Sequence, residues 1–454
     1  MNIKYTTMAG TLLAACAAFA SGMPEVTKVT LKQDSSRTVT ISYMLKEAPA
    51  IVTLDIMTNS PSGWVSIGGK NIDCFSQDSD VWKRVEPSET EVKTILWHPD
   101  QSWPDHKIPL KDGGVKAVVT AWALDDTPDY MVVDISASAT PLSQRYYPSV
   151  DFLPGGLLGD DAYRTTKLVM RKIRAKNVRW TMGSISEASR DATKEKTHDV
   201  TLTNNYYIGV FEVTQAQLEL IAGINGASYR TEGAMRPAGG VSFNALRCNT
   251  ARTGSCAYAG GSWPQKPYEG SVLDLLNNRT GLDFDLPSEA QWEFACRAGN
   301  GEGRWGNGLP ISSDSYDPNL PGRYKYNGGN VENSATPPVL TAPSYDCTPE
   351  YGPAIVGTYD KNDLGLYDMH GNAFELCLDW LSDDITALNG VVNIDPANPM
   401  NTLAGVAGNT RVRRGGSYHA SRSDCRSGFR LGADPASVAG EMWGFRLVCG
   451  AGLK

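Results

Sequence analysis

The sequence has few histidines and no surplus of basic residues. Only five of its 454 residues are histidine, so a metal centre built on several histidine ligands has little material to form. The 42 lysines and arginines are outnumbered by 50 acidic residues, which gives a net charge of −8. Proteins that bind nucleic acid usually carry a basic surplus, so nucleic acid is not expected as a partner.

A second absence concerns long apolar runs. After the N-terminus no run of about 18 apolar residues occurs, so no transmembrane span is predicted. Residues 1–22 instead combine Lys4, a short apolar stretch and the cleavage pattern Ala18-Phe19-Ala20, which predicts a signal peptide and an exported protein. The residues before Cys16 also resemble a lipoprotein box, so lipid anchoring at Cys16 is an alternative.

Glycine and proline are plentiful, with 45 and 26 residues respectively. This abundance favours short strands, turns and long loops over a helical bundle. The hydrophobic content of 41% is ample for packed cores and excludes wholesale disorder. The length is too great for one ordinary domain, so two or three are expected.

The pattern of residues 23–140 is that of an all-β domain. Val39, Ile41 and Tyr43 alternate with polar residues, as in a strand with one buried face. About seven short strands in about 120 residues are typical of a β-sandwich, immunoglobulin-like or similar. Residues 141–175 are rich in proline and glycine turns, and they are predicted to be a linker.

Residues 176–454 have a different sequence pattern, in which polar loops separate a few short predicted helices. Thr214 with Gln217, and Ser288 with Gln291, form capping-box patterns that predict two helix starts. Cleavage after Ala20 would leave eight of the nine cysteines, an even number that suits disulfides in an exported chain.

This second region carries a series of ordered motifs. They lie at residues 180–183, 197–202, 211–214, 240–243, 286–294, 365–375, 414–418 and 444–446. Together they resemble the formylglycine-generating enzyme family, also called sulfatase-modifying factors. The resemblance implies an α+β domain with little regular structure, a variant of the C-type lectin fold that binds calcium. Residues 1–175 lie outside the resemblance.

The resemblance also implies where catalysis would occur. In catalytic members, two cysteines three and eight residues after the serine of a Gly-Gly-Ser motif bind copper(I), which suits thiolate ligands. With Ser417 as that serine, the first position holds Ala420 and the second holds Cys425. Ser417 and Cys425 are therefore the catalytic candidates if the protein is active. Phe374 replaces a tryptophan of the family, and copper is not expected to bind.

The family's calcium motif is better preserved. Matching residues 365–375 to it assigns Asp368 and Glu375 as side-chain ligands, while Gly371 and Ala373 would supply backbone carbonyls. Carboxylates mixed with carbonyls suit a hard cation such as calcium. Calcium is therefore the expected cofactor, and a capped turn with surface acids is the alternative.

The pairing of the cysteines stays open, because eight cysteines allow 105 connectivities. In the family a structural cysteine often occupies the position of Cys296, so a bridge between Cys296 and Cys425 is the leading candidate. Cys347, Cys377 and Cys449 are competing partners for Cys425. Cys248 and Cys256 are close enough in sequence to close a small loop.

Two functions from different classes follow. The first is an exported, non-catalytic protein that binds a peptide or a glycan through a calcium-stabilised lectin-like domain. The second is a formylglycine-generating oxidase, which converts a sulfatase cysteine to formylglycine with copper and oxygen. Ala420 favours the first.

Overall fold

The computed structural model describes most of the chain. The described residues are 22–106, 113–136, 143–187, 189–226, 233–248, 266–313, 316–327, 352–382, 392–394, 410–437 and 442–452. Apart from residue 22, the predicted signal peptide lies outside them, as does Cys16. Within these ranges no helix is long and apolar enough to cross a membrane.

The N-terminal region consists of two small antiparallel sheets. The first has the order β1-β2-β6, and in the second β3 pairs with β4, β5 and β7. Their bounds are β1 (Glu25–Gln33), β2 (Val39–Lys46), β3 (Ala50–Ser60), β4 (Gly63–Ser66), β5 (Lys83–Val85), β6 (Lys93–Trp97) and β7 (Val115–Ala123). The short helices are η1 (Gly69–Asn71) and α1 (Pro99–Ser102). In β2 the predicted alternation is confirmed, because Val39, Ile41 and Tyr43 are all buried in a core shared by both sheets.

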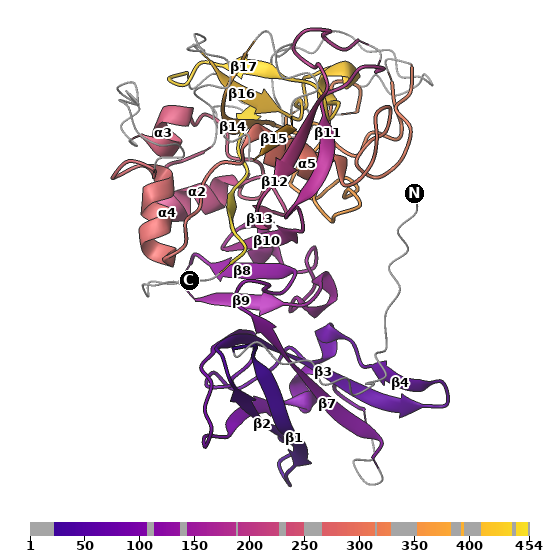
Figure 1. Cartoon of the computed structure of the whole chain (residues 1–454), viewed down its shortest axis with the longest axis vertical. Coiled ribbons are helices and arrows are strands. Elements are labelled where there is room, and N and C mark those ends of the chain that lie inside the picture. Colours follow the sequence, from indigo (N-terminus) through magenta and orange to yellow (C-terminus); the bar gives the residue numbers. More distant parts are fainter. Residues whose placement is uncertain are drawn as a thin grey trace.

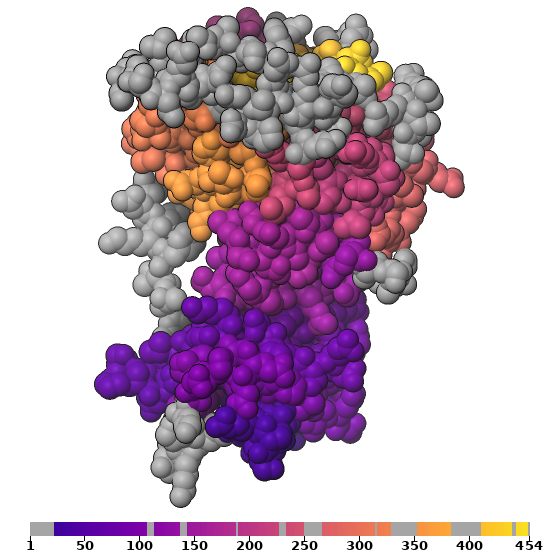
Figure 2. All heavy atoms as spheres, turned by 180° about the vertical axis from the view of Figure 1, so that it is seen from behind, coloured from indigo at the N-terminus to yellow at the C-terminus, as the bar shows by residue number. Residues whose placement is uncertain are grey.

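A five-stranded sheet joins this region to the C-terminal part, with the order β19-β13-β10-β8-β9. The strands are β8 (Tyr130–Asp134), β9 (Gln144–Tyr147), β10 (Lys167–Ile173), β13 (Tyr206–Gly209) and β19 (Val448–Gly450). Helices η2 (Val150–Phe152) and η3 (Asp161–Arg164) lie between β9 and β10 in the sequence. Figure 1 shows β8, β9 and β10 between the indigo lower lobe and the upper part, and Figure 2 shows the same order from behind.

This sheet corrects the expectation of a linker at residues 141–175, since β9 and β10 lie within that range. It also includes β8, which the sequence pattern assigned to the N-terminal domain. The reason is that β10 is buried on both faces. Leu168 and Met170 belong to one hydrophobic cluster, whereas Val169 belongs to another. A strand that is buried on both faces shows no alternation, so it is hard to recognise beside strong turn signals.

The C-terminal part surrounds this sheet with helices and two further small sheets. The helices are α2 (Gln215–Ala222), α3 (Phe243–Arg247), α4 (Val272–Thr280), α5 (Glu289–Arg297) and η5 (Arg422–Cys425). One sheet contains β11 (Val178–Met182), β12 (His198–Leu202) and β15 (Val392–Ile394). The other contains β17 (Leu431–Ala433), β16 (Arg411–Arg414), β14 (Phe374–Trp380) and β18 (Trp443–Gly444). The result is a mixed, β-rich fold with few helices.

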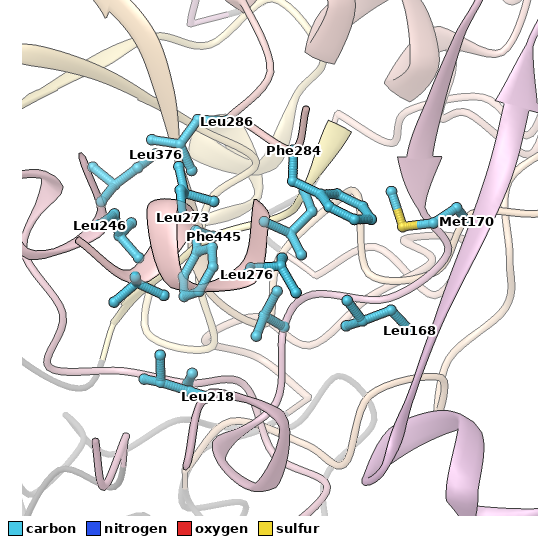
Figure 3. Packing of buried hydrophobic residues seen from close by; sticks show 14 of the residues in the cluster. Leu168, Met170, Leu218, Leu246, Leu273, Leu276, Phe284, Leu286, Leu376 and Phe445 are labelled. Atoms are coloured by element: carbon cyan, nitrogen blue, oxygen red, sulfur yellow. The ribbon is translucent and has the colours of Figure 1, made fainter. Parts of the chain in front are cut away.

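Both predicted capping boxes are confirmed. Thr214 caps α2 and Ser288 caps α5, and in each case the glutamine three residues later returns a bond to the cap backbone. Helix α4 contacts α2 and α3, and Figure 3 shows Leu273 and Leu276 of α4 in one cluster with Leu168 of β10. The local start signals therefore place the helix ends, while distant segments supply the surfaces on which the helices pack, as β11, β14 and β16 do for α5.

Buried ion pairs link α5 to the sheet that contains β16. Arg414 of β16 pairs with Glu293, which also receives a 2.8 Å bond from Arg297. Arg430 pairs with Glu289 at 2.6 Å. All five side chains are less than a tenth exposed, so these bonds form away from water. Buried charges must be paired, and the pairs therefore fix the position of α5 on the sheet.

Asp379 lies beside this network and is expected to make stability depend on pH. Burial and the neighbouring Glu289 carboxylate raise its pKa to about 7. Between about pH 4 and 7 the folded state would keep the Asp379 proton, which the unfolded chain has lost, so stability should fall as pH rises. Thermal melting of the wild type should show a higher midpoint at pH 5 than at pH 7.5, and Asp379→Asn should reduce the difference. An unchanged difference in the variant would contradict this assignment.

Candidate functional site

The loop that precedes β14 has an unusual backbone. Asp368 and Asn372 have positive φ angles of 58° and 68°, and Gly371 has a φ of 109°. A Cβ atom on Gly371 would lie 2.3 Å from the Arg323 carbonyl oxygen, so only glycine fits there. A distant segment stabilises the loop, because the Gly371 N–H donates to the Gly415 carbonyl at 2.6 Å. Backbone strain of this kind concentrates at functional sites.

Three buried carboxylates converge on this loop with one arginine. Asp368 and Glu375 come from the predicted calcium motif, and Glu212 joins them from the turn before α2. Burial, with Asp368 and Glu375 nearby, raises the pKa of Glu212 well above its usual range. Burial also raises the pKa of Asp368 to about 6. Arg446 is the cation that faces them.

Glu212 is a residue that the sequence analysis did not single out. Its Oε1 accepts the Ala373 N–H at 2.9 Å, and its Oε2 accepts a bond from the Asn372 side chain at 2.6 Å. It therefore holds the calcium-motif loop in place from about 160 residues away. Its position inside the motif at residues 211–214 was the available signal, but spacing alone could not reveal the contact.

The two predicted calcium ligands differ in whether a carboxylate oxygen is available to bind a cation. Asp368 Oδ2 accepts the Gly357 N–H at 2.7 Å, whereas Oδ1 is buried and has no hydrogen-bond partner. Glu375 is already engaged, because its carboxylate accepts bonds from Arg446 and from the Trp292 ring nitrogen. Among the described side chains no group of three or more His, Cys, Asp or Glu is arranged to hold a metal. Asp368 thus offers a free oxygen, while the full ligand set stays a prediction.

The positions that match the family's copper ligands, Ala420 and Cys425, lie after β16. The structure brings the two catalytic candidates together, since the Ser417 backbone N–H bonds to the Cys425 thiol. That thiol is fully buried, and burial raises its pKa well above its usual value. A Cβ atom on Gly416 would lie 2.5 Å from the Cys425 sulfur, so the loop covers the thiol closely. Ala420 is also buried, and its methyl group offers no ligand.

The predicted bridge between Cys296 and Cys425 is absent, because both are free cysteines in the structure. The Cys296 sulfur faces the His370 ring instead, with 3.6 Å to Nε2, and lies 3.5 Å from the Ser427 hydroxyl. His370 lies between the two cysteines, since its Nδ1 donates to the Cys425 carbonyl at 2.9 Å. Packing around this ring, which sequence cannot show, separates the two thiols.

The pair of Cys296 and His370 is not set up for nucleophilic chemistry. Burial raises the pKa of Cys296 to about 12 and lowers that of His370 to about 4. The Gly306 N–H donates to His370 Nε2 at 2.9 Å, so this nitrogen has no proton to give. Both groups are therefore neutral near pH 7, and a reactive cysteine needs the opposite shift.

The remaining cysteines fall into two groups. Cys248 is disulfide-bonded, but its predicted partner Cys256 lies outside the described residues, as does Cys347, one of the alternative partners of Cys425. Cys74, Cys377 and Cys449 are free, and the last two are buried. The structure thus gives no bridge to Cys425 from any cysteine it describes.

The C-terminal part is thus a β-rich domain with few helices, and its loops carry the ordered sequence motifs. A family model described as "Sulfatase-modifying factor enzyme 1-like domain" matches residues 168–451. The chain therefore belongs to this family. The match begins in β10, which agrees with the inclusion of that strand in the C-terminal part.

Similar proteins carry different names. The formylglycine-generating enzyme of Thermomonospora curvata is 33% identical over 185 residues, which cover 36% of this chain and 53% of that enzyme. The serine/threonine-protein kinase Pkn1 of Chlamydia trachomatis is 30% identical over 161 residues, which cover 36% of this chain and 20% of the kinase. The solved structure of Treponema denticola variable protein 1 covers 63% of this chain and 95% of its own, with 22% identity and a TM-score of 0.42. The matched region spans about half, or less, of these two curated relatives.

Proposed function

We propose that the protein is an exported, non-catalytic member of this family that binds a peptide or a glycan through its C-terminal domain. Export is supported by the signal-like N-terminus and by the disulfide at Cys248, since disulfides persist in oxidising compartments. The N-terminal sheets, which we take as an immunoglobulin-like module, would hold that domain away from the cell surface or contact a partner.

One observation carries the non-catalytic assignment. Ala420 removes one of the two thiols that copper(I) needs, and the other, Cys425, is enclosed and neutral. A thiol binds copper(I) as a thiolate, and at Cys425 burial disfavours that form more than the nearby Arg422 favours it. With neither two sulfurs nor an accessible one, the site has no means of activating oxygen in the way of the active enzymes.

The alternative is a formylglycine-generating oxidase. It is favoured by the retention of Ser417 and by its backbone N–H, which bonds to the Cys425 thiol and so keeps the two residues close together. It is also favoured by the similarity to curated formylglycine-generating enzymes. It would require Cys425 to become accessible and a second ligand to replace the missing cysteine.

Calcium would stabilise the domain rather than react. We propose that Asp368 supplies a side-chain oxygen and that Gly371 and Ala373 supply carbonyls, with Glu375 beside them. The unpartnered Oδ1 of Asp368 supports this assignment, because a buried oxygen without a partner is costly unless a proton or a cation satisfies it.

A copper and substrate assay tests the proposal. Reduced wild-type protein is mixed with copper(I) and a cysteine-containing sulfatase peptide, and the peptide is followed by mass spectrometry. We expect no loss of about 18 mass units from the peptide and no tight copper binding, because one thiol cannot form the two-coordinate sulfur site. A catalytic formylglycine-generating enzyme is the positive control, and the variant Ala420→Cys tests whether a second thiol alone is enough for copper binding. Conversion of the peptide cysteine to formylglycine by the wild type would contradict the non-catalytic assignment.

A further inference from the structure

The three arginines of β16 have different surroundings. Arg414 is fully buried and pairs with Glu293 on α5. Arg411 is also buried, and it donates to the Leu378 carbonyl at 2.6 Å. Arg413 points to the same face of the strand as Arg411, but it is only partly buried, so part of it is accessible.

Arg413 has aromatic neighbours and no polar partner. Its guanidinium lies 4.6 Å from the centre of the Phe374 ring and 4.4 Å from that of Trp443. In the described part of the chain it makes no hydrogen bond and no ion pair, and its Nε is buried and unsatisfied. Phe429 extends the aromatic wall, with its ring centre 6.4 Å from that of Phe374.

An unpaired guanidinium in this position is unfavourable by itself. Burial lowers the pKa of Arg413 to about 10, and no carboxylate raises it again. At Arg414 and Arg446 neighbouring glutamates do raise the pKa. Cation–π contacts recover only part of the cost of removing such a charge from water. An anion at Arg413 would complete the arrangement that its neighbour Arg414 already has.

The chemistry of this position selects the anion. A guanidinium presents a planar fork that matches a carboxylate in a bidentate pair. The flanking rings are apolar, and they suit a methylene stem beside the carboxylate better than the hydroxyl groups of a sugar. The chain has a net charge of −8, so attraction of an acidic ligand must come from this local contact and not from the overall field.

We propose that Arg413, flanked by Phe374 and Trp443, binds the carboxylate of an acidic peptide ligand. This inference rests on the proposed function, because it names the ligand class of the same domain. Phe374 stands where the family has tryptophan, and Arg413 lies four residues before Ser417. The proposed binding residues therefore lie within or beside the motifs that surround the copper ligands in catalytic relatives.

The test is selection from a phage-displayed library of random peptides on the full-length protein. We expect the wild type to enrich sequences that contain Asp or Glu. Arg413→Met keeps the side-chain stem between the two rings but removes the charge. It should lose the acidic preference and weaken binding of the selected peptides by about 10- to 100-fold. Arg179→Met is the matched control, because Arg179 is exposed and pairs only with Asp199, and it should behave as the wild type.

Folding and ligand class are checked separately. Arg413→Met should melt within a few degrees of the wild type, since no hydrogen bond is lost. Selection of peptides without acidic residues, or an unchanged preference in the variant, would overturn the inference and leave a binding function intact. Binding of uronate oligosaccharides that depends on Arg413, with no peptide selected, would overturn the peptide assignment. Oxidation of a bound cysteine peptide would instead defeat the proposed function itself.

Discussion

Replacing Arg414 by methionine is expected to destabilise the protein by about 3–5 kcal/mol, the usual cost of removing one partner of a buried ion pair. Arg414 pairs with Glu293 and also donates to the carbonyls of Ser427 and Gly428 at 2.7 and 3.0 Å. Without it, Glu293 would keep the Arg297 guanidinium and the Gly183 N–H, and the carbonyls of Ser427, Gly428 and Phe429 would lose a donor. Arg414 thus makes one of the two sets of buried ion pairs between α5 and the sheet of β16, and the other is Arg430 with Glu289.

Urea unfolding followed by tryptophan fluorescence measures the effect. The matched control is Arg413→Met, one residue earlier on the same strand, where no hydrogen bond or ion pair exists among the described residues. We expect a large fall in the unfolding midpoint for Arg414→Met and little change for Arg413→Met. If both variants lower the unfolding midpoint equally, the loss of stability comes from substituting this strand and not from losing the ion pair.

The second large effect concerns calcium. Removing calcium with a chelator is expected to lower the melting temperature by about 5–10 °C. The reason is that saturation at about a hundredfold excess over the dissociation constant stabilises a protein by about 2.7 kcal/mol. For a domain of this size each kcal/mol corresponds to about 2–4 °C. The proposed ligand oxygen is Oδ1 of Asp368, which has no other partner.

Thermal melting in calcium and in chelator checks this for three proteins. The wild type should show the shift, and Asp368→Ala should melt at the same temperature in both conditions. Asp360→Asn, an exposed position eight residues earlier, should keep the shift of the wild type. If the melting midpoint of the wild type is the same with and without the chelator, calcium is not part of the proposed function. The fold and the proposed peptide ligand would not be affected by that result.

Several features could be predicted because their signals are local. The alternation in β2 and the capping boxes at Thr214 and Ser288 depend on residues within one or two turns of each other. The family could be recognised because its motifs occur in order along residues 168–451. These features need no knowledge of distant contacts, so the sequence suffices for them.

Other features depend on contacts between distant segments. The resemblance to the family predicts a bridge between Cys296 and Cys425, but His370 lies between them and both thiols are free. Glu212 reaches the calcium-motif loop from far along the chain, and no spacing rule indicates it.

The sequence by itself determined the family, the absence of a copper ligand at Ala420, and the starts of two helices at Thr214 and Ser288. The tertiary structure decided that β10 belongs to a shared central sheet, that Cys425 is enclosed, and that Arg413 has no counter-ion among the described residues. The physical reason is the same in each case. Burial and pairing of a side chain depend on which segments pack around it, whereas residue identity and local periodicity are written directly in the chain.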